Sequence, residues 1–182
     1  MNTDTALVII DMQMEMQHRI DAGRPHINPQ APATIATLAA AFRDTGHPVI
    51  HVRHAEGDST SPLHPDAPGY PPMACARERP GEAVFVKRSS SAFATTGLEA
   101  HLRERGIAHI HVVGAVAGFC VASTVRAASD LGFGVTVVCE AVIGFDLPSA
   151  GLEAGVIFDV TMELLAADFA EVVGSEAVLT RL

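Results

Sequence analysis

Residues 114–133, GAVAGFCVASTVRAASDLGF, join two hydrophobic patterns around a single cysteine. Upstream of the cysteine a short apolar run predicts a buried strand, and downstream the apolar residues recur at helical spacing. The run comprises Ile110, Val112, Val113 and Ala115, and the helical positions are Val121, Thr124, Val125, Ala128 and Leu131. Cys120 is therefore predicted at the junction between a strand and the helix that follows it.

Similar apolar runs alternate with helical stretches along the rest of the chain. Strands are predicted at residues 6–11, 49–54, 83–87, 109–115, 135–141 and 169–173, and further helices around residues 35–42, 98–102 and 152–166. Continuous Val/Ile runs between helices are typical of a mostly parallel sheet with helices on both faces. No linker or internal repeat interrupts this pattern, so we expect one domain over residues 1–182.

Composition excludes several classes of function. The net charge is −9 and the twelve basic residues are scattered, whereas nucleic-acid binders normally carry a basic face. No apolar run approaches the roughly 18 residues of a membrane span. The segment MNTDTALVII has no basic region before its apolar stretch, which favours a strand over a signal peptide. We therefore expect a cytoplasmic location.

Polar residues follow several of the predicted strands. Asp11 follows the first, His54 ends the second, Lys87 ends the third, and Cys120 comes just after the fourth. In open parallel sheets, sites gather at the carboxyl ends of the strands. An acid, a base, a lysine and a thiol are thus expected at one edge of the sheet.

Cys120 has two possible roles, a buried core thiol or a nucleophile. At a helix start it would face free N–H groups and the positive end of the helix dipole, and both lower a thiol pKa, as does a nearby Lys87. The same N–H groups would bind an oxyanion. Taken alone, Lys87 could cap a strand at the surface and Asp11 could cap a turn. Their combination with Cys120 favours catalysis.

No metal or cofactor is expected. Among the candidate ligands His47, His51, His54 and His64, His51 and His54 are three residues apart on one strand and so point to opposite faces, which disfavours their joint ligation of a metal. The separations between Cys75, Cys120 and Cys139 match no zinc pattern, and we expect three reduced thiols. The segment GAVAGF does not match the dinucleotide fingerprint.

Four segments resemble the isochorismatase-like cysteine hydrolases, in the same order and over essentially the whole chain. They are LVIIDMQ, GHPVIHVRH, VFVKRSSSAFATTGLEAHLRERGI and VVGAVAGFCVASTVRAASDLGFGVTVVCEA. The resemblance implies a three-layer α/β/α sandwich around a mostly parallel sheet of about six strands, a Rossmann-like fold.

The resemblance also implies site residues. An Asp, a Lys and a Cys form the catalytic set of the family, and they correspond here to Asp11, Lys87 and Cys120. The family places a cis peptide shortly before the nucleophile, which by position falls between Ala115 and Val116. Its implied role is to direct the Val116 N–H, together with that of Cys120, at the oxyanion.

This chain departs from the family pattern at two places. Ala117 and Gly118 stand where many relatives have Thr-Asp, which implies a smaller and less polar pocket floor. The segment HVRHAEGDS lacks the Asp and His metal motif of nicotinamidase-like members. True isochorismatases, by the same resemblance, lack the nucleophile, so Cys120 favours an acyl-enzyme route over vinyl-ether hydrolysis.

The resulting hypothesis is a cysteine hydrolase that cleaves a small amide, ureido or related C–N bond. His54, Tyr70, Phe93 and Phe119 are candidates for the pocket walls, and the long loop 55–81 is a candidate lid or binding loop. A homo-oligomer is expected. The alternatives are an isochorismatase-type hydrolase of another small substrate, a non-catalytic binding protein on the same scaffold, and a thiol-redox protein.

Overall fold

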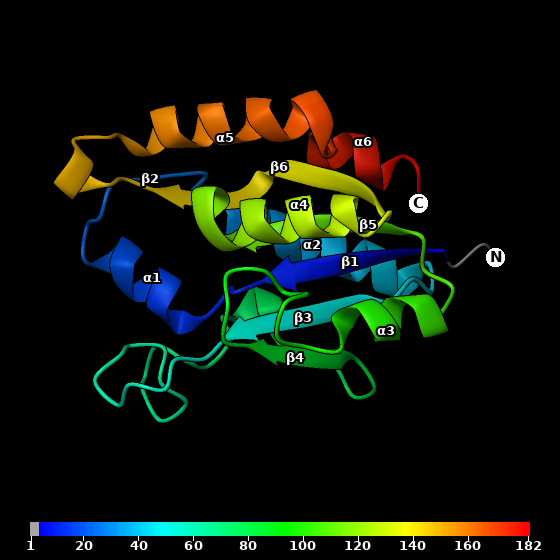
Figure 1. The fold of residues 1–182 in the computed structure, drawn as a ribbon, viewed down its shortest axis with the longest axis horizontal. Coiled ribbons are helices and arrows are strands. Elements are labelled where there is room, and N and C mark those ends of the chain that lie inside the picture. Colours follow the sequence, from blue (N-terminus) through cyan, green and yellow to red (C-terminus); the bar gives the residue numbers. More distant parts are fainter. Residues whose placement is uncertain (1–3) are drawn as a thin grey trace.

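The computed structural model describes residues 4–182, which form a single sheet between two layers of helices (Figure 1). The strands are β1 (Thr5–Ile10), β2 (His26–Ile27), β3 (Val49–His54), β4 (Ala83–Lys87), β5 (His109–Ala115), β6 (Gly134–Phe145) and β7 (Glu171–Val173). The helices are α1 (Met14–Asp21), α2 (Ala31–Asp44), α3 (Leu98–Glu104), α4 (Ala122–Asp130), α5 (Ala154–Asp168) and α6 (Ser175–Leu179).

The seven described strands have the order β2-β6-β5-β1-β3-β4, and β7 pairs with β6. All pairings are parallel except that of the two-residue strand β2 with β6. The mostly parallel α/β sandwich predicted from the sequence is therefore confirmed, and β2 adds the seventh strand. The arrows of β1, β3 and β4 in Figure 1 point to the edge where α1 and the long loop lie, while both chain ends lie at the opposite edge.

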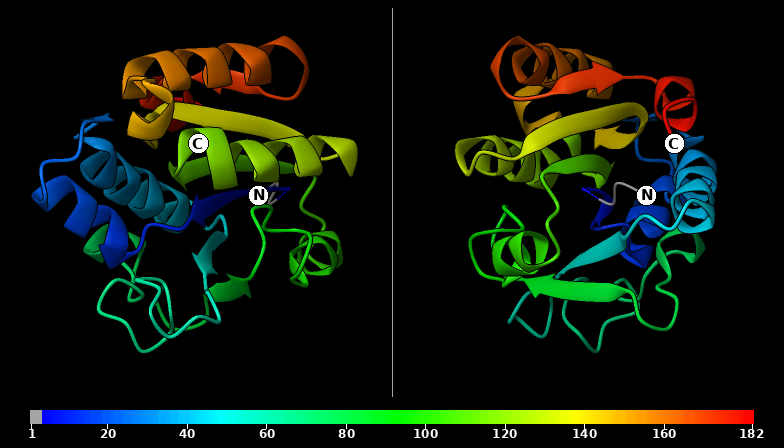
Figure 2. Two further views of the ribbon diagram at one scale, coloured as in Figure 1. Left: turned by 60° about the vertical axis from the view of Figure 1, so that its left-hand side comes forward. Right: turned by 90° about the vertical axis from the view of Figure 1, so that its right-hand side faces the viewer.

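Alternation along the buried strand β1 separates the two hydrophobic cores. Ala6, Val8 and Ile10 pack in the core that includes buried residues of α3, α4 and α5. Leu7 and Ile9 pack in the core that includes residues of α1, α2 and α6. Figure 2 shows α2 and α6 on one side of the sheet and α3 and α4 on the other, which gives the three layers.

Three elements were not expected from the sequence, namely helices α1 and α6 and strand β2. Helix α1 buries only one of its eight residues, Met16, so its apolar periodicity is too weak to predict a helix. Strand β2 has two residues and is fixed by Asn28, whose side-chain amide donates to the carbonyls of Cys139 and Val142, both at 2.8 Å. No helix among residues 4–182 is long and apolar enough to cross a membrane.

Candidate active site

The ends of four neighbouring strands bring the predicted polar residues together. Asp11 directly follows β1, and its N–H donates to the carbonyl of Val52 on β3 at 2.9 Å. His54 and Lys87 are register partners at the ends of β3 and β4. Cys120 lies in a single π-helical turn, Ala117–Val121, between β5 and α4. The edge therefore carries the acid, imidazole, amine and thiol that the strand pattern predicts.

The Lys87 ammonium group contacts the other three side chains. Its Nζ lies 2.7 Å from Asp11 Oδ2, 3.0 Å from His54 Nδ1 and 3.2 Å from Cys120 Sγ. An ammonium group has three hydrogens to donate, and each of these atoms can accept one. The other ring nitrogen of His54, Nε2, lies 3.6 Å from Glu56 Oε1.

Burial makes the Lys87–Asp11 ion pair a strong constraint on the site. The Lys87 side chain is fully buried and that of Asp11 is 6% exposed. A buried charge that loses its partner is costly, so each of these residues requires the other. Asp11 Oδ1 is buried and makes no hydrogen bond within the described part of the chain, which leaves this oxygen available to a nearby donor.

The backbone before Cys120 is shaped by a close approach of two strands. Gly114 has φ 122°, and a Cβ atom on it would lie 2.0 Å from the carbonyl oxygen of Ile10. Only glycine fits there, because this φ is unfavourable for other residues and the two backbones are in contact. This close approach places the end of β5 beside Asp11. The Ala115–Val116 peptide bond, which follows shortly after Gly114, is cis.

The π-helical turn leaves the Cys120 N–H out of the hydrogen-bond ladder from Val116. The Val116 carbonyl accepts from the N–H of Phe119 at 3.0 Å and from that of Val121 at 3.3 Å, but not from the N–H of Cys120 between them. Single π turns of this kind are frequent at functional sites. The geometry suits a donor to a ligand that lies beside the thiol.

The pKa directions correct one expectation from the sequence. Burial, and then the negative charge of Asp11, raise the pKa of Cys120 to about 12, although the Lys87 ammonium opposes this. Lys87 lowers the thiol pKa as expected, but burial and Asp11 outweigh it, so the expected net decrease is wrong. Burial also raises the pKa of Asp11, against the opposing effect of Lys87. The resting site holds a protonated thiol beside a carboxylate of increased basicity.

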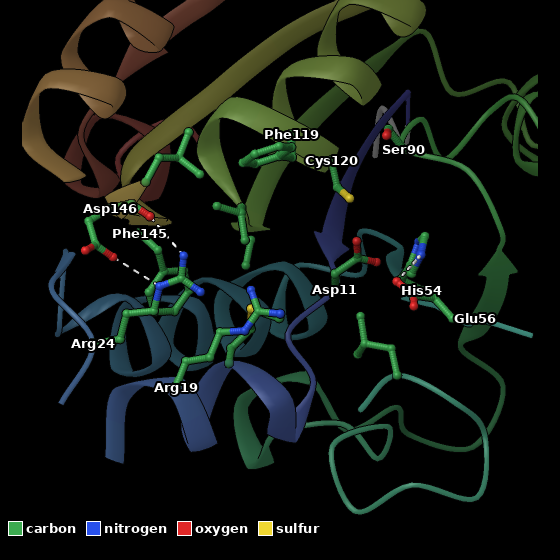
Figure 3. Close-up of a pocket in the computed structure, with 15 residues that line it drawn as sticks. Asp11, Arg19, Arg24, His54, Glu56, Ser90, Phe119, Cys120, Phe145 and Asp146 are labelled. Carbon is green, nitrogen blue, oxygen red and sulfur yellow. Dashed lines mark hydrogen bonds and ion pairs between the residues drawn. The ribbon is translucent and has the colours of Figure 1, made fainter. Parts of the chain in front are cut away.

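A cavity of about 280 Å³ opens directly onto these groups (Figure 3). This volume is just below the usual range for pockets that hold drug-sized ligands, so the cavity suits a small molecule. Its walls are Asp11, Met16, Arg19, Arg24, His54, Glu56, Leu63, Ser90, Ala115, Val116, Phe119, Cys120, Phe145, Asp146 and Leu147. Glu56 and Leu63 come from the loop between β3 and β4, which thus contributes one wall.

The four candidates for the pocket walls divide into two pairs. His54 and Phe119 line the cavity, and Phe119 is 50% exposed. Tyr70 and Phe93 are not among the lining residues. Phe93 packs against the core and stacks on Phe133 with ring centroids 5.9 Å apart. Tyr70 contributes a carbonyl that accepts from the Gln13 side chain at 2.8 Å, so it belongs to the support of the loop.

Sequence reasoning missed Gln13 and two arginines. The fully buried Gln13 side chain donates to the carbonyls of His54 and Tyr70 and accepts from the N–H of His54 at 2.8 Å. It thereby ties the end of β3 to the long loop, and its place in the LVIIDMQ segment was the available signal. Arg19 and Arg24 lie in and after a helix that the apolar pattern did not predict.

Three side chains of the site carry atoms of the kind that bind metal ions. Ligand atoms of Asp11, His54 and Cys120 lie within 4.8 Å of one another. The Lys87 ammonium, however, contacts all three residues and already supplies the positive charge at their centre. A divalent ion would have to displace a buried lysine from its ion pair, so these residues do not fit a metal site.

The chain is similar to known proteins over most of its length. Residues 5–176 match the Isochorismatase domain family. The uncharacterized isochorismatase family protein YddQ of Bacillus subtilis is 34% identical over 75% of this chain and 76% of that protein. The ureidoacrylate amidohydrolase RutB of Variovorax paradoxus is 27% identical over 87% of this chain and 75% of its own length.

Solved structures agree with the sequence comparison. The crystal structure of a putative hydrolase of the isochorismatase family from Chromobacterium violaceum has a TM-score of 0.91 and 33% identity, and covers 99% of this chain and 94% of that one. The fold and the match over residues 5–176 agree. The chain therefore belongs to the isochorismatase family of hydrolases.

Proposed function

We propose that the protein is a cysteine-dependent hydrolase of a small amide or ureido C–N bond, acting through a thioester on Cys120. The observation that carries this proposal is the triple contact of the Lys87 ammonium with Asp11, Cys120 and His54 at the wall of a small cavity. A nucleophile, a base and a cation in mutual contact are the parts that covalent acyl transfer needs.

In the first step, Asp11 takes the thiol proton as Cys120 Sγ attacks the substrate carbonyl. The two side chains have acceptor and thiol atoms within 4.8 Å, and such contacts shorten when substrate binds. The high thiol pKa and the raised pKa of Asp11 favour transfer of the proton during attack over a preformed thiolate. Lys87 stabilises the developing negative charge on sulfur.

The tetrahedral intermediate carries its charge on the former carbonyl oxygen. The N–H groups of Val116 and Cys120 are the proposed donors to this oxygen, at the cis peptide and in the π-helical turn. Donors of this kind are typically worth about 10²–10³-fold in rate. The C–N bond then breaks, and protonated Asp11 gives its proton to the departing amine or ammonia.

Hydrolysis of the thioester completes the cycle. Asp11, again a carboxylate, takes a proton from water, the oxygen attacks the thioester carbonyl, and the C–S bond breaks. The acid product leaves, and the proton on Asp11 returns to Cys120 Sγ. The relative RutB is by its name an amidohydrolase, which supports a C–N bond as the target.

Ammonia release from a panel of small primary amides and ureido compounds tests the proposal. We expect release by the wild-type protein and a loss of at least about 10³-fold for Cys120→Ala, since the covalent route is then closed. Cys75→Ala is the matched control, because Cys75 is also a free, partly buried thiol but does not line the cavity. Release that persists unchanged in Cys120→Ala would refute the cysteine route.

A further inference from the structure

Two arginines line the cavity opposite the thiol. Arg19 is on α1 and Arg24 follows its end, and Figure 3 shows both guanidinium groups on the α1 side of the cavity, away from Cys120. The chain has 12 basic and 21 acidic residues, so two arginines in so small a cavity are not explained by overall charge. The proposed chemistry at Cys120 uses neither of them.

Both side chains are held in fixed positions. Arg19 Nε donates to Glu15 Oε1 at 2.8 Å. Arg24 Nε donates to Asp146 Oδ1 at 3.1 Å, and its Nη2 donates to the Asp146 carbonyl at 2.9 Å. The guanidinium carbons lie 5.8 Å and 5.3 Å from the centre of the Phe145 ring. The two cations thus share one aromatic platform, which is itself a wall of the cavity.

Donor capacity remains on both groups. A guanidinium group has five N–H donors, and within residues 4–182 Arg19 uses only Nε and Arg24 only Nε and Nη2. Both side chains are about one-third exposed, toward the cavity that they line. The planar fork of an arginine matches the two oxygens of a carboxylate, and the resulting bonds are charge-assisted.

We propose that the substrate carries a carboxylate at the end remote from its scissile C–N bond, and that Arg19 and Arg24 bind it over the Phe145 ring. The substrate class is then an amide or ureide of a small carboxylic acid, which rests on the proposed function. A monoanion fits better than a dianion, because Glu15 and Asp146 already offset much of the positive charge. Asp11 and Glu56 across the cavity disfavour a second negative charge on the ligand.

Succinamate and succinamide form a matched pair of probes, because they differ only in a carboxylate against a carboxamide. We expect wild-type kcat/KM for ammonia release to be at least tenfold higher for succinamate. Arg19→Gln lowers this ratio at least fivefold, since the loss falls mainly on the charged substrate. Arg19 is the better position to change, because Arg24 also holds the main chain at Asp146.

Arg103→Gln is the matched control. Arg103 makes the same i−4 ion pair, with Glu99 at 2.8 Å, and its guanidinium carbon lies 4.8 Å from the centre of the Phe133 ring, but it is outside the cavity. The control is expected to keep the wild-type ratio. A ratio near one in the wild-type protein, or an unchanged ratio in Arg19→Gln, overturns the carboxylate site while the proposed function stands.

Binding to a protein without the nucleophile separates the two proposals. Calorimetric titration of the Cys120→Ala protein is expected to show at least tenfold tighter binding of succinamate than of succinamide, and Arg19→Gln in that background removes the preference. If no compound releases ammonia but this preference is present, the proposed function fails and the carboxylate site stands. Equal binding of both compounds overturns the site.

Discussion

Replacement of Asp11 by asparagine is predicted to change the reactivity and the activity of Cys120 in opposite directions. The pKa of Cys120 is raised from 9.0 to about 12, mainly by burial and then by the charge of Asp11. At pH 8 the thiolate fraction is then about 10⁻⁴, against about one in ten for an unperturbed thiol. The resting enzyme should therefore react slowly with alkylating agents.

The asparagine keeps the shape of the side chain and removes its negative charge. In the wild-type structure Lys87 Nζ lies 3.2 Å from the sulfur and lowers the thiol pKa, and in the variant it is expected to do so without the opposing carboxylate. Each unit by which the pKa falls increases the thiolate fraction at pH 8 about tenfold. Amide hydrolysis nevertheless loses about 10²–10⁴-fold, because the general base is gone.

The assay is alkylation by iodoacetamide between pH 7 and pH 10.5, with the modified cysteines identified by peptide mass mapping. Cys75 is an internal reference, because burial raises its pKa to about 11 and Asp11 is not among the causes. Alkylation of Cys120 is expected to rise in Asp11→Asn while that of Cys75 stays constant. Slower alkylation of Cys120 in this variant, or a wild-type Cys120 pKa below 8, would refute the reasoning.

Three further predictions concern stability. Lys87→Met leaves Asp11 buried without its cation and should lower the free energy of unfolding in urea by about 3–5 kcal/mol; an unchanged value would contradict the buried ion pair. Gly114→Ala should lower the free energy of unfolding by about 3 kcal/mol or more, because the added Cβ would meet the backbone of β1. Gly97→Ala is the control and should stay soluble and active, because no atom lies within 4 Å of its added Cβ. Above pH 9 the unfolded chain loses the Cys120 proton that the folded state keeps, so the free energy of unfolding should fall from pH 9 toward 12. In urea unfolding series, Cys120→Ala should reduce this slope by up to about 1.4 kcal/mol per pH unit. An identical slope in the two proteins would count against the raised pKa.

The parts of the fold that the sequence predicts are those with strong hydrophobic patterns. The Val/Ile runs of β1, β3 and β5 are buried on both faces, so their sequences alone mark them as central parallel strands. The rule that sites lie at strand ends then brings Asp11, Lys87 and Cys120 to one edge without any knowledge of side-chain contacts. Weakly patterned elements such as α1 were not predicted, and neither were the roles of Arg19 on α1 and of Arg24 just after it.

The missed features depend on contacts between distant segments. Phe93 and Tyr70 were chosen for their place in the sequence. In the structure Phe93 stacks on Phe133 at the core, and the Tyr70 carbonyl accepts a hydrogen bond from Gln13. The direction of the Cys120 pKa was wrong because the helix start and Lys87 were considered without burial. Desolvation of the thiol and the charge of Asp11 appear only when the strands are assembled.

The most direct test of the thioester route is the mass of the intact protein at short times after mixing with a substrate that releases ammonia. The account predicts an acyl adduct that maps to Cys120, forms with a burst of ammonia and decays as the acid product appears. Turnover with no adduct, together with full activity of Cys120→Ala, would contradict it.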